Sequence, residues 1–372
     1  MTTKTATPQT MRAFVLTGHG GMDKLEYRSN WPVPQPGPDE VLVRVHACGL
    51  NNTDVNTRTA WYSKGVSEQT TGGALETADE NDAAWGGAAI AFPRIQGADV
   101  AGIVAAAGPG ADRNLLGQRV LIDPWIRDQR DPLNPDKAIY FGSECDGGYA
   151  DYVAIDHRQV HPIVSALSDA ELATFATSYV TAENMLNRAN VGADDVVLIP
   201  GASGGVGSAL IQLANRRGAT TIALCGQAKA SQVEAVGANA ILPRAPENLR
   251  AALAQSTGRD TVTVVADVVG GSLWPQVIDA LARGGRYTCA GAIAGPMVEL
   301  DLRTLYLRDL IFTGATVVPP GVFGDLVGYI ERGELKPLLA RIFPLRALVE
   351  AQEAFMAKQH VGNIVVTMVE TP

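Results

Sequence analysis

The sequence lacks the features that mark membrane, secreted or disulfide-linked proteins. Its four cysteines, Cys48, Cys145, Cys225 and Cys289, lie far apart, so they form neither a C-x-x-C pair nor a disulfide ladder. No apolar run reaches the roughly 18 residues that a membrane span requires. The first residues also lack the apolar segment of a signal peptide. These absences predict a cytoplasmic protein with reduced cysteines and no membrane partner.

Positive charge is scarce as well. The chain has 30 lysines and arginines against 39 acidic residues, a formal net charge of −9, and therefore no general attraction for nucleic acid. Hydrophobic residues make up 46% of the 372 positions, which excludes a largely disordered chain. The length predicts two domains.

Strand signals dominate residues 11–60 and 97–160, where apolar stretches alternate with turn residues. Between them, residues 61–93 have no sustained periodicity, and we expect a long loop or lid there. Helical spacing begins near residue 165, where Ser168 followed by Glu171 fits a capping box.

Beyond that helix, short apolar strands alternate with helices. The strands are DVVLIPGA, TTIALC, VTVVADVVG and RYTCAGAI, and the helices between them include GVGSALIQLANRRG, KASQVEAVGA and SLWPQVIDALARGG (residues 272–285). This alternation is typical of a parallel sheet with helices on both faces. The fold class is therefore predicted as α/β, a doubly wound Rossmann sheet preceded by a β-rich domain.

A glycine-rich turn follows the first strand of that sheet. Gly201, Gly204 and Gly207 stand between a strand and a helix, where a bare backbone lets a pyrophosphate approach the helix N-terminus. A tight turn without a ligand is the alternative. The expected cofactor-binding residues of the turn are Gly201, Ser203, Gly204, Gly205, Val206 and Gly207. The ends of later strands add Gly226, Val268, Gly291 and Ala292, because cofactors lie at the carboxyl edge of such sheets.

The second strand indicates which dinucleotide binds. NAD-binding units place an acid at its end, on the ribose hydroxyls, but no acid occurs between Gly207 and Glu234. Lys229 stands there instead and could meet a 2′-phosphate, with Arg216 or Arg217 nearby. We therefore expect NADPH as the cofactor. A solvated lysine at a helix start is the alternative for Lys229.

Motifs along nearly the whole chain resemble the medium-chain dehydrogenase/reductase superfamily. They include CGLNNTDVNTR, FPRIQGADVAGIV, DGGYADYVAI, GASGGVG, YVTAENML and HVGNIVV. The resemblance implies a GroES-like catalytic domain over 1–161 and 336–372 and a Rossmann domain over 162–335. The active site would lie in the cleft between them.

The resemblance also allows the metal positions to be compared. The zinc enzymes of the superfamily supply ligands where this chain has Asn51, Ala98 and about Thr177. An amide, a methyl group and a hydroxyl cannot replace thiolate and imidazole. The four closely spaced cysteines of the structural zinc lobe are also missing, with Cys145 alone in that region. The chain is therefore similar to the zinc-free branch, and no metal is predicted.

That branch reduces quinones and enones, for which hydrogen-bond donors suffice because conjugation carries the developing charge to a remote oxygen. The resemblance places Asn51, Asn52 and Thr53 at the substrate oxygen and Thr181 at the nicotinamide. Tyr62, in the irregular segment, or a water would give the proton. Asp54 and Arg58 are expected to form a structural ion pair rather than a proton relay. Asn56 departs from the tyrosine usual in quinone reductases.

Two other functions stay open. One is a zinc-free carbonyl reductase or alcohol dehydrogenase, since Thr53 and Asp54 retain a pair found in the zinc branch. The other is a protein that binds NADPH without catalysis. The strand-like stretch 310–318 would be exposed at a sheet edge unless paired, and its counterpart in the superfamily pairs between subunits. We therefore expect a homodimer that acts on a small-molecule substrate.

Overall fold

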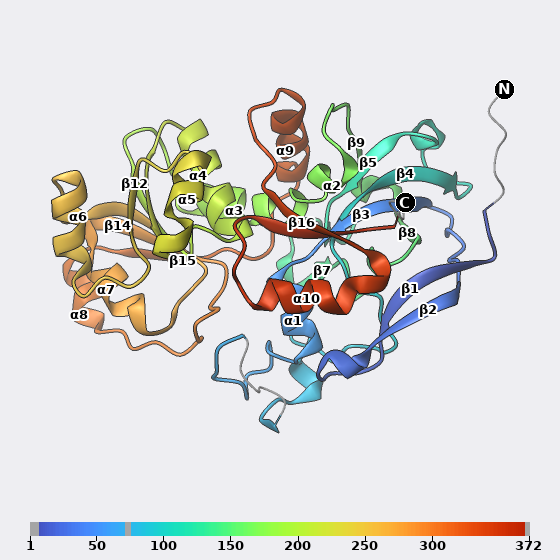
Figure 1. Ribbon diagram of the computed structural model, residues 1–372, viewed down its shortest axis with the longest axis horizontal. Coiled ribbons are helices and arrows are strands. Elements are labelled where there is room, and N and C mark those ends of the chain that lie inside the picture. The colour runs from blue at the N-terminus through green and yellow to red at the C-terminus, as the bar shows by residue number, and fades with distance from the viewer. Residues whose placement is uncertain (1–6, 71–75, 369–372) are drawn as a thin grey trace.

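Two sheets organise the chain in a computed structural model that describes residues 7–70 and 76–368. Figure 1 shows them toward opposite ends of the long axis, with α3 (Ala176–Arg188) and β16 (Leu339–Pro344) near the middle. Within the described ranges, no helix combines the length and apolar character needed to cross a membrane.

A seven-stranded sheet combines strands from the first half of the chain with its last two strands, β16 and β17. Its order is β16-β17-β3-β4-β5-β9, with β8 paired to β3. The remaining pieces on this side are a β1–β2 hairpin, a short β6–β7 pair and three helices. The bounds are β1 (Thr10–Leu16), β2 (Leu25–Pro32), β3 (Glu40–Gly49), α1 (Asn52–Arg58), β4 (Asp99–Ala107), β5 (Arg119–Ile122), β6 (Trp125–Ile126), β7 (Ile139–Tyr140), β8 (Tyr152–Asp156), β9 (Val160–Pro162), α2 (Asp169–Leu172), α10 (Leu348–Met356) and β17 (Asn363–Thr367).

The other sheet is parallel throughout, in the order β12-β11-β10-β13-β14-β15. Every residue of its central strand β10 is buried, as the continuous apolar run requires. The predicted Rossmann sheet and fold class are thus confirmed. The bounds are β10 (Val196–Pro200), α4 (Gly205–Arg216), β11 (Thr220–Cys225), α5 (Ala230–Val236), β12 (Ala240–Pro243), α6 (Leu249–Thr257), β13 (Val262–Asp267), α7 (Trp274–Asp279), β14 (Leu281–Cys289), α8 (Leu302–Leu307), β15 (Ile311–Gly314) and α9 (Val322–Glu331).

One predicted helix is too long. The helix expected over 272–285 ends at Asp279, and Leu281 already pairs with Val262 as the first residue of β14. Gly284 has a φ of +74°, which a helix interior does not allow. The helical spacing of apolar residues continues past Asp279, but pairing with β13 makes the following residues a strand.

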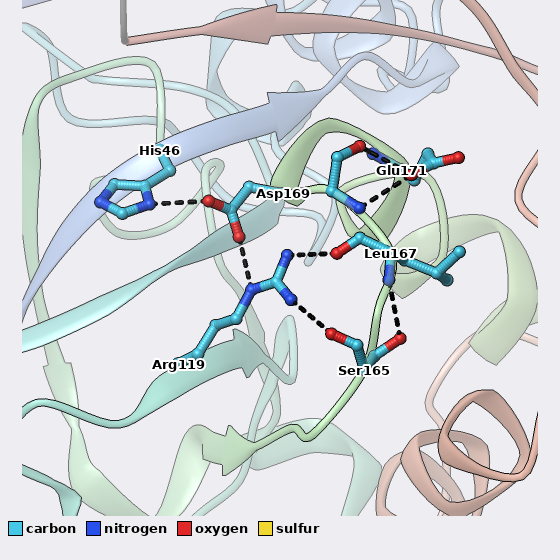
Figure 2. Close-up of polar contacts among 7 residues, drawn as sticks. His46, Arg119, Ser165, Leu167, Asp169 and Glu171 are labelled. Carbon is cyan, nitrogen blue, oxygen red and sulfur yellow. Dashed lines mark hydrogen bonds and ion pairs between the residues drawn. The ribbon is translucent and has the colours of Figure 1, made fainter.

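The chain crosses from one sheet to the other through a hydrogen-bonded connection (Figure 2). Asp169 accepts from His46 Nδ1 of β3 at 2.8 Å and from Arg119 Nε of β5 at 2.6 Å. Arg119 also donates to the carbonyls of Ser165 and Leu167. The predicted capping box is present, since Ser168 Oγ accepts from Glu171 N and Glu171 accepts from Ser168 N. These bonds fix where α2 and then α3 start.

The last strand returns to the glycine-rich turn. Gly362 N donates to the Ser203 carbonyl at 3.0 Å, and Asn363 Nδ2 donates to the Thr174 carbonyl at 3.0 Å. A Cβ on Gly205 would lie 2.3 Å from Asn363 Oδ1 and 2.4 Å from Ser178 Oγ. Glycine is required at Gly205 because three chain segments meet there.

Gly207 and Gly204 form a matched test of close packing in the turn. A Cβ on Gly207 would lie 2.4 Å from the Gly201 carbonyl oxygen, whereas one on Gly204 would lie 3.6 Å from the same atom. We predict that Gly207→Ala lowers the free energy of unfolding by about 1–3 kcal/mol. Gly204→Ala should cost less than about 1 kcal/mol. Urea unfolding of the ligand-free proteins measures both, and equal losses would contradict this account of the turn.

Candidate active site

A single cleft between the sheets collects most of the predicted site residues. Among the described residues, the cleft is lined by Asn51, Asn52, Thr53, Tyr62, Thr181, Gly201, Gly204, Gly205, Val206, Gly207, Val268, Gly291 and Ala292. The carboxyl ends of β10, β13 and β14 therefore face the start of α1 across it. This is the edge at which α/β sheets bind ligands.

Three predicted cofactor residues stand outside that lining. Ser203 lies under the turn, where its carbonyl holds Gly362. Gly226 follows β11, and a Cβ there would meet no atom within 4 Å, so the space beside it is open. Lys229 is the N-cap of α5 and lies beside Lys358, which follows α10.

The start of α1 presents the substrate-side donors. Asn51 has extended backbone angles at the N-cap, and its N–H donates to Asp54 Oδ2 at 2.7 Å. The side-chain nitrogen of Asn51 reaches hydrogen-bond geometry with no described residue, nor do the Thr53 and Thr70 hydroxyls. Asn51 does lie near Asp99, and Thr53 near Tyr62. Buried donors in poor hydrogen-bond geometry are costly, so a ligand oxygen would compete well for them.

Aromatic rings form the outer wall of the cleft. Trp125 stacks edge-on against Trp85 and Tyr140, with ring centroids 4.6 and 4.9 Å apart. Trp61 and Tyr62 line the cleft from the lid segment. These flat apolar faces favour a planar, conjugated ligand.

The lid segment 61–93 spans both domains. Its described part has one short 3-10 helix, Glu80–Asp82, which agrees with the predicted lack of regular structure. Thr70 N donates to the Ile293 carbonyl of the Rossmann side at 3.1 Å. Gly86 N donates to Glu144 at 3.0 Å on the catalytic side. Residues 71–75 lie outside the described part.

Two buried carboxyl groups lie beneath the cleft floor. Burial raises the pKa of Asp54 to about 7, although hydrogen bonds from Asn51 N and Tyr149 lower it. Burial raises the pKa of Asp99 to about 6, against hydrogen bonds from Thr177 that lower it. Each carboxylate also repels the other. No ion pair joins either group to a described cation, so burial favours their neutral forms.

The expected ion pair between Asp54 and Arg58 is not formed. Asp54 turns to Asn51 and Tyr149, whereas Arg58 donates to the Gly20 carbonyl at 2.8 Å and to Gln352 at 3.1 Å. Arg58 therefore joins α1 to α10, which lies beside it in Figure 1. The i,i+4 spacing was misleading because both side chains found long-range partners.

The residues at the superfamily's zinc position do not fit zinc. Asn51 offers an amide, Ala98 a methyl group and Thr177 a hydroxyl, while Asp99 accepts two hydrogen bonds from Thr177. One carboxylate does not complete a set of three nitrogen or sulfur ligands. Within the described ranges, no group of three His, Cys, Asp or Glu side chains could hold a metal ion.

Two lysines outside the cleft lining lie beside the start of α1. Lys229 Nζ donates to the Lys358 carbonyl at 2.6 Å, and Lys358 Nζ donates to Asn52 Oδ1 at 2.8 Å. Neither lysine forms an ion pair with a described carboxylate. Burial, followed by repulsion from Lys229, lowers the pKa of Lys358 to about 7.

The suggestion that Arg216 or Arg217 lies near Lys229 is wrong. Both stand at the far end of α4, where Arg216 pairs with Glu334 and Arg217 with Glu183. Lys358 takes that place instead. It was missed because α10 carries it back from the end of the chain, and no local pattern marks it.

The tyrosine and acid at the cleft floor were also missed. Tyr140 lines the cleft, and its hydroxyl lies 2.7 Å from Thr177 Oγ1, which in turn bonds to Asp99. Thr177 was noted only as a lost metal ligand. The acid beside Ala98 was the available signal, because a buried acid without a metal needs other partners.

Comparisons with known proteins identify the family. Residues 37–165 match the alcohol dehydrogenase GroES-like domain, and residues 205–333 match the zinc-binding dehydrogenase domain. The chain belongs to the medium-chain dehydrogenase/reductase superfamily and is an oxidoreductase of that class. The predicted superfamily is thus confirmed. Oxidoreductases of this superfamily use nicotinamide cofactors.

Particular relatives carry different names. A solved structure from Sinorhizobium meliloti, provisionally described as an alcohol dehydrogenase, is 43% identical, covers 97% of each chain and superposes with a TM-score of 0.87. The quinone oxidoreductase of Rattus norvegicus is 26% identical over 92% of this chain and 93% of its own. An NAD-dependent alcohol dehydrogenase of Sulfurisphaera tokodaii is 25% identical over 92% and 95%.

Proposed function

We propose that this protein is a zinc-independent, NADPH-dependent reductase of quinones or α,β-unsaturated carbonyl compounds. The main support is the floor of the cleft, where the amide of Asn51 and the hydroxyl of Thr177 stand at the superfamily's metal position. The aromatic rings that line the cleft lie beside them. Similarity to quinone oxidoreductases supports the same conclusion. We also propose that the substrate is a small molecule and that the protein acts in the cytoplasm.

The nucleotide side of the cleft suits a dinucleotide. Free N–H groups at the start of α4, a helix of 12 residues, follow a glycine-rich turn whose Gly201, Gly204 and Gly205 carry no side chains, which favours a pyrophosphate. Val268, Gly291 and Ala292 leave room at the strand ends, and Thr181 of α3 lines the inner end. A bound nicotinamide would supply a hydride.

The Asn51 amide and the Thr53 hydroxyl are placed to hold the substrate oxygen. In a conjugated acceptor, negative charge develops on that oxygen while the hydride adds elsewhere. Fixed donors in a site that excludes water stabilise such charge without a metal. The aromatic rings orient the plane of the substrate, and the lid keeps water out during the reaction.

Reduction of a simple carbonyl is the second candidate. Thr53 lines the cleft beside Asp54, as the retained Thr-Asp pair suggested, and the 43% identical relative is described as an alcohol dehydrogenase. In the reduction of a simple carbonyl, hydride adds to the carbonyl carbon and the full negative charge develops on the oxygen bonded to it as an alkoxide. That oxygen therefore needs a stronger partner than an amide. The amide at Asn51 therefore favours conjugated substrates.

The edge of the Rossmann sheet supports a homodimer. β15 ends that sheet with its outer hydrogen-bonding groups unpaired among the described residues. Exposed apolar side chains gather along the same edge, at Met297, Val298, Leu302, Tyr306, Leu307 and Ile311. A patch of this kind marks an interface, and a second copy of β15 would extend the sheet.

The first test is the product formed from an enone. In chelator-treated buffer with NADPH, we expect the saturated ketone, and Asn51→Ala should lower kcat/KM by about 10²-fold as donors to an oxyanion do. Asn114→Ala, on an exposed turn of the same domain, is the matched control. Nucleotide affinity verifies that each variant is folded. An allylic alcohol, or activity lost to the chelator, would contradict the proposal.

Cofactor choice is tested at the lysine pair. Because a charge-assisted hydrogen bond to a phosphate contributes about 1.5–3 kcal/mol, Lys229→Ala should weaken NADPH binding by about tenfold or more and leave NADH binding nearly unchanged. Lys137→Ala, on the other domain, should change neither. Fluorescence titration gives both constants, and equal losses for the two nucleotides would rule out a 2′-phosphate contact.

The dimer is tested by placing a charge on the sheet edge. Ile311→Lys should yield a monomer in sedimentation velocity at micromolar concentration, because the new ammonium cannot be buried between two strands. Ile342→Lys is the control, since Ile342 has similar exposure on β16 at the edge of the other sheet. A native monomer, or a dimer broken only by Ile342→Lys, would contradict the β15 interface.

A further inference from the structure

We propose that Tyr140, Thr177 and Asp99 form a proton relay, in which the buried Asp99 carboxyl is the proton store and Tyr140 delivers the proton to substrate. This inference rests on the proposed reductase function and names the proton source for it. The relay occupies the floor of the cleft, where α3 begins against β4 and β7.

Continuous hydrogen bonds connect the three side chains. The Tyr140 hydroxyl lies 2.7 Å from Thr177 Oγ1, and Thr177 Oγ1 bonds to Asp99 Oδ1. Tyr140 and Thr177 both line the cleft, whereas Asp99 is only 1% exposed. A proton can therefore pass from a group hidden from bulk water to a ligand in the cleft.

Tyr62, the proton donor expected from the sequence, has no hydrogen-bonded path to a buried acid among the described residues. Burial raises its pKa, and its hydroxyl faces Thr53 and Asn56, neither of which titrates. Neither neighbour reaches full hydrogen-bond geometry. Tyr140 differs because its hydrogen bond leads through Thr177 to an ionisable acid.

The proton transfers balance. Hydride addition to a conjugated double bond leaves the π electron pair on the substrate as an enolate. The enolate takes the Tyr140 hydroxyl proton, the Tyr140 oxygen takes the Thr177 proton, and Thr177 takes the Asp99 carboxyl proton. Three O–H bonds break and three bonds to hydrogen form, so only Asp99 gains a charge. Water in the emptied cleft returns the proton by the same route.

The surroundings of Asp99 suit both of its charge states. Burial and the absence of a partner cation favour the acid before the transfer. Afterwards the carboxylate accepts from Thr177 N at 2.9 Å and from Thr177 Oγ1 at the start of α3, where the helix dipole favours an anion. The titratable groups that face Asp99 are Asp54 of α1, Cys48 of β3, Tyr140 of β7 and Tyr149 before β8. None is a cation.

Asp99 could instead serve only to fix the N-terminus of α3, so the test measures proton transfer. Because the acid form is required, native kcat should fall as pH rises past the pKa of Asp99, about 6. Tyr140→Phe and Thr177→Val should each lower kcat by about 10²-fold and abolish that pH dependence. Nucleotide affinity should not change. Thr177→Ser keeps the hydroxyl and should restore kcat, while Tyr27→Phe on β2 is the matched tyrosine control.

Infrared difference spectra across the same pH range give a readout that needs no turnover. A protonated carboxyl band that titrates near pH 6 should vanish in Asp99→Asn and shift in Thr177→Val. If the native protein reduces no acceptor, the proposed function fails, and the band still decides whether Asp99 stores a proton. An unchanged band in both variants would overturn the relay. So would native kcat and pH dependence in Tyr140→Phe.

Discussion

The contact between the glycine-rich turn and the returning end of the chain is the constraint on which the active cleft depends. Gly362 bonds to the Ser203 carbonyl, and Asn363 fills the space that a side chain on Gly205 would need. This contact joins a local βα turn to strand β17, which is paired to β3 in the other domain. In the proposed binding mode, the glycines that leave room for a pyrophosphate would thereby also bring α1 and Lys358, which follows α10, toward the nucleotide. In that binding mode, glycine would be needed at this turn for two reasons: close packing against Asn363 and room for the pyrophosphate.

Because of that contact, acidic groups lie at one end of the cleft and basic groups lie near the other. At the substrate end, amide and hydroxyl donors stand over two buried acids, where related enzymes hold a metal. At the end proposed to bind the nucleotide, Lys229 and Lys358 lie close enough for repulsion to lower the pKa of Lys358. A polar core of this kind is costly in the free protein, and a ligand that satisfies it gains the energy that folding did not recover. In the proposed function, a bound dinucleotide and an oxygen-bearing acceptor would satisfy these polar groups.

Local sequence was sufficient for the parallel sheet, the glycine turn and the capping box at Ser168, because each depends on neighbours within a few residues. It failed where distant segments decide. Leu281 became strand through its pairing with Val262. The bond between Lys358 and Asn52 spans 306 positions, and that between Thr177 and Asp99 spans 78. Asn51 and Thr53 were proposed because family motifs mark them, whereas Tyr140 ends the two-residue strand β7, where no such motif stands.

One physical cause explains the electrostatics of both ends. Burial disfavours charge, so it raises the pKa of Asp54 and Asp99 and lowers the pKa of Lys358, which brings all three values to between about 6 and about 7. Each group can therefore change its protonation near neutral pH when a neighbour changes charge. An anion bound at the lysines would draw a proton onto Lys358, and charge developing on a substrate would draw one from Asp99. In the proposed reaction, the buried acids beside the superfamily's metal position would thus supply mobile protons, where the zinc enzymes supply a fixed positive charge.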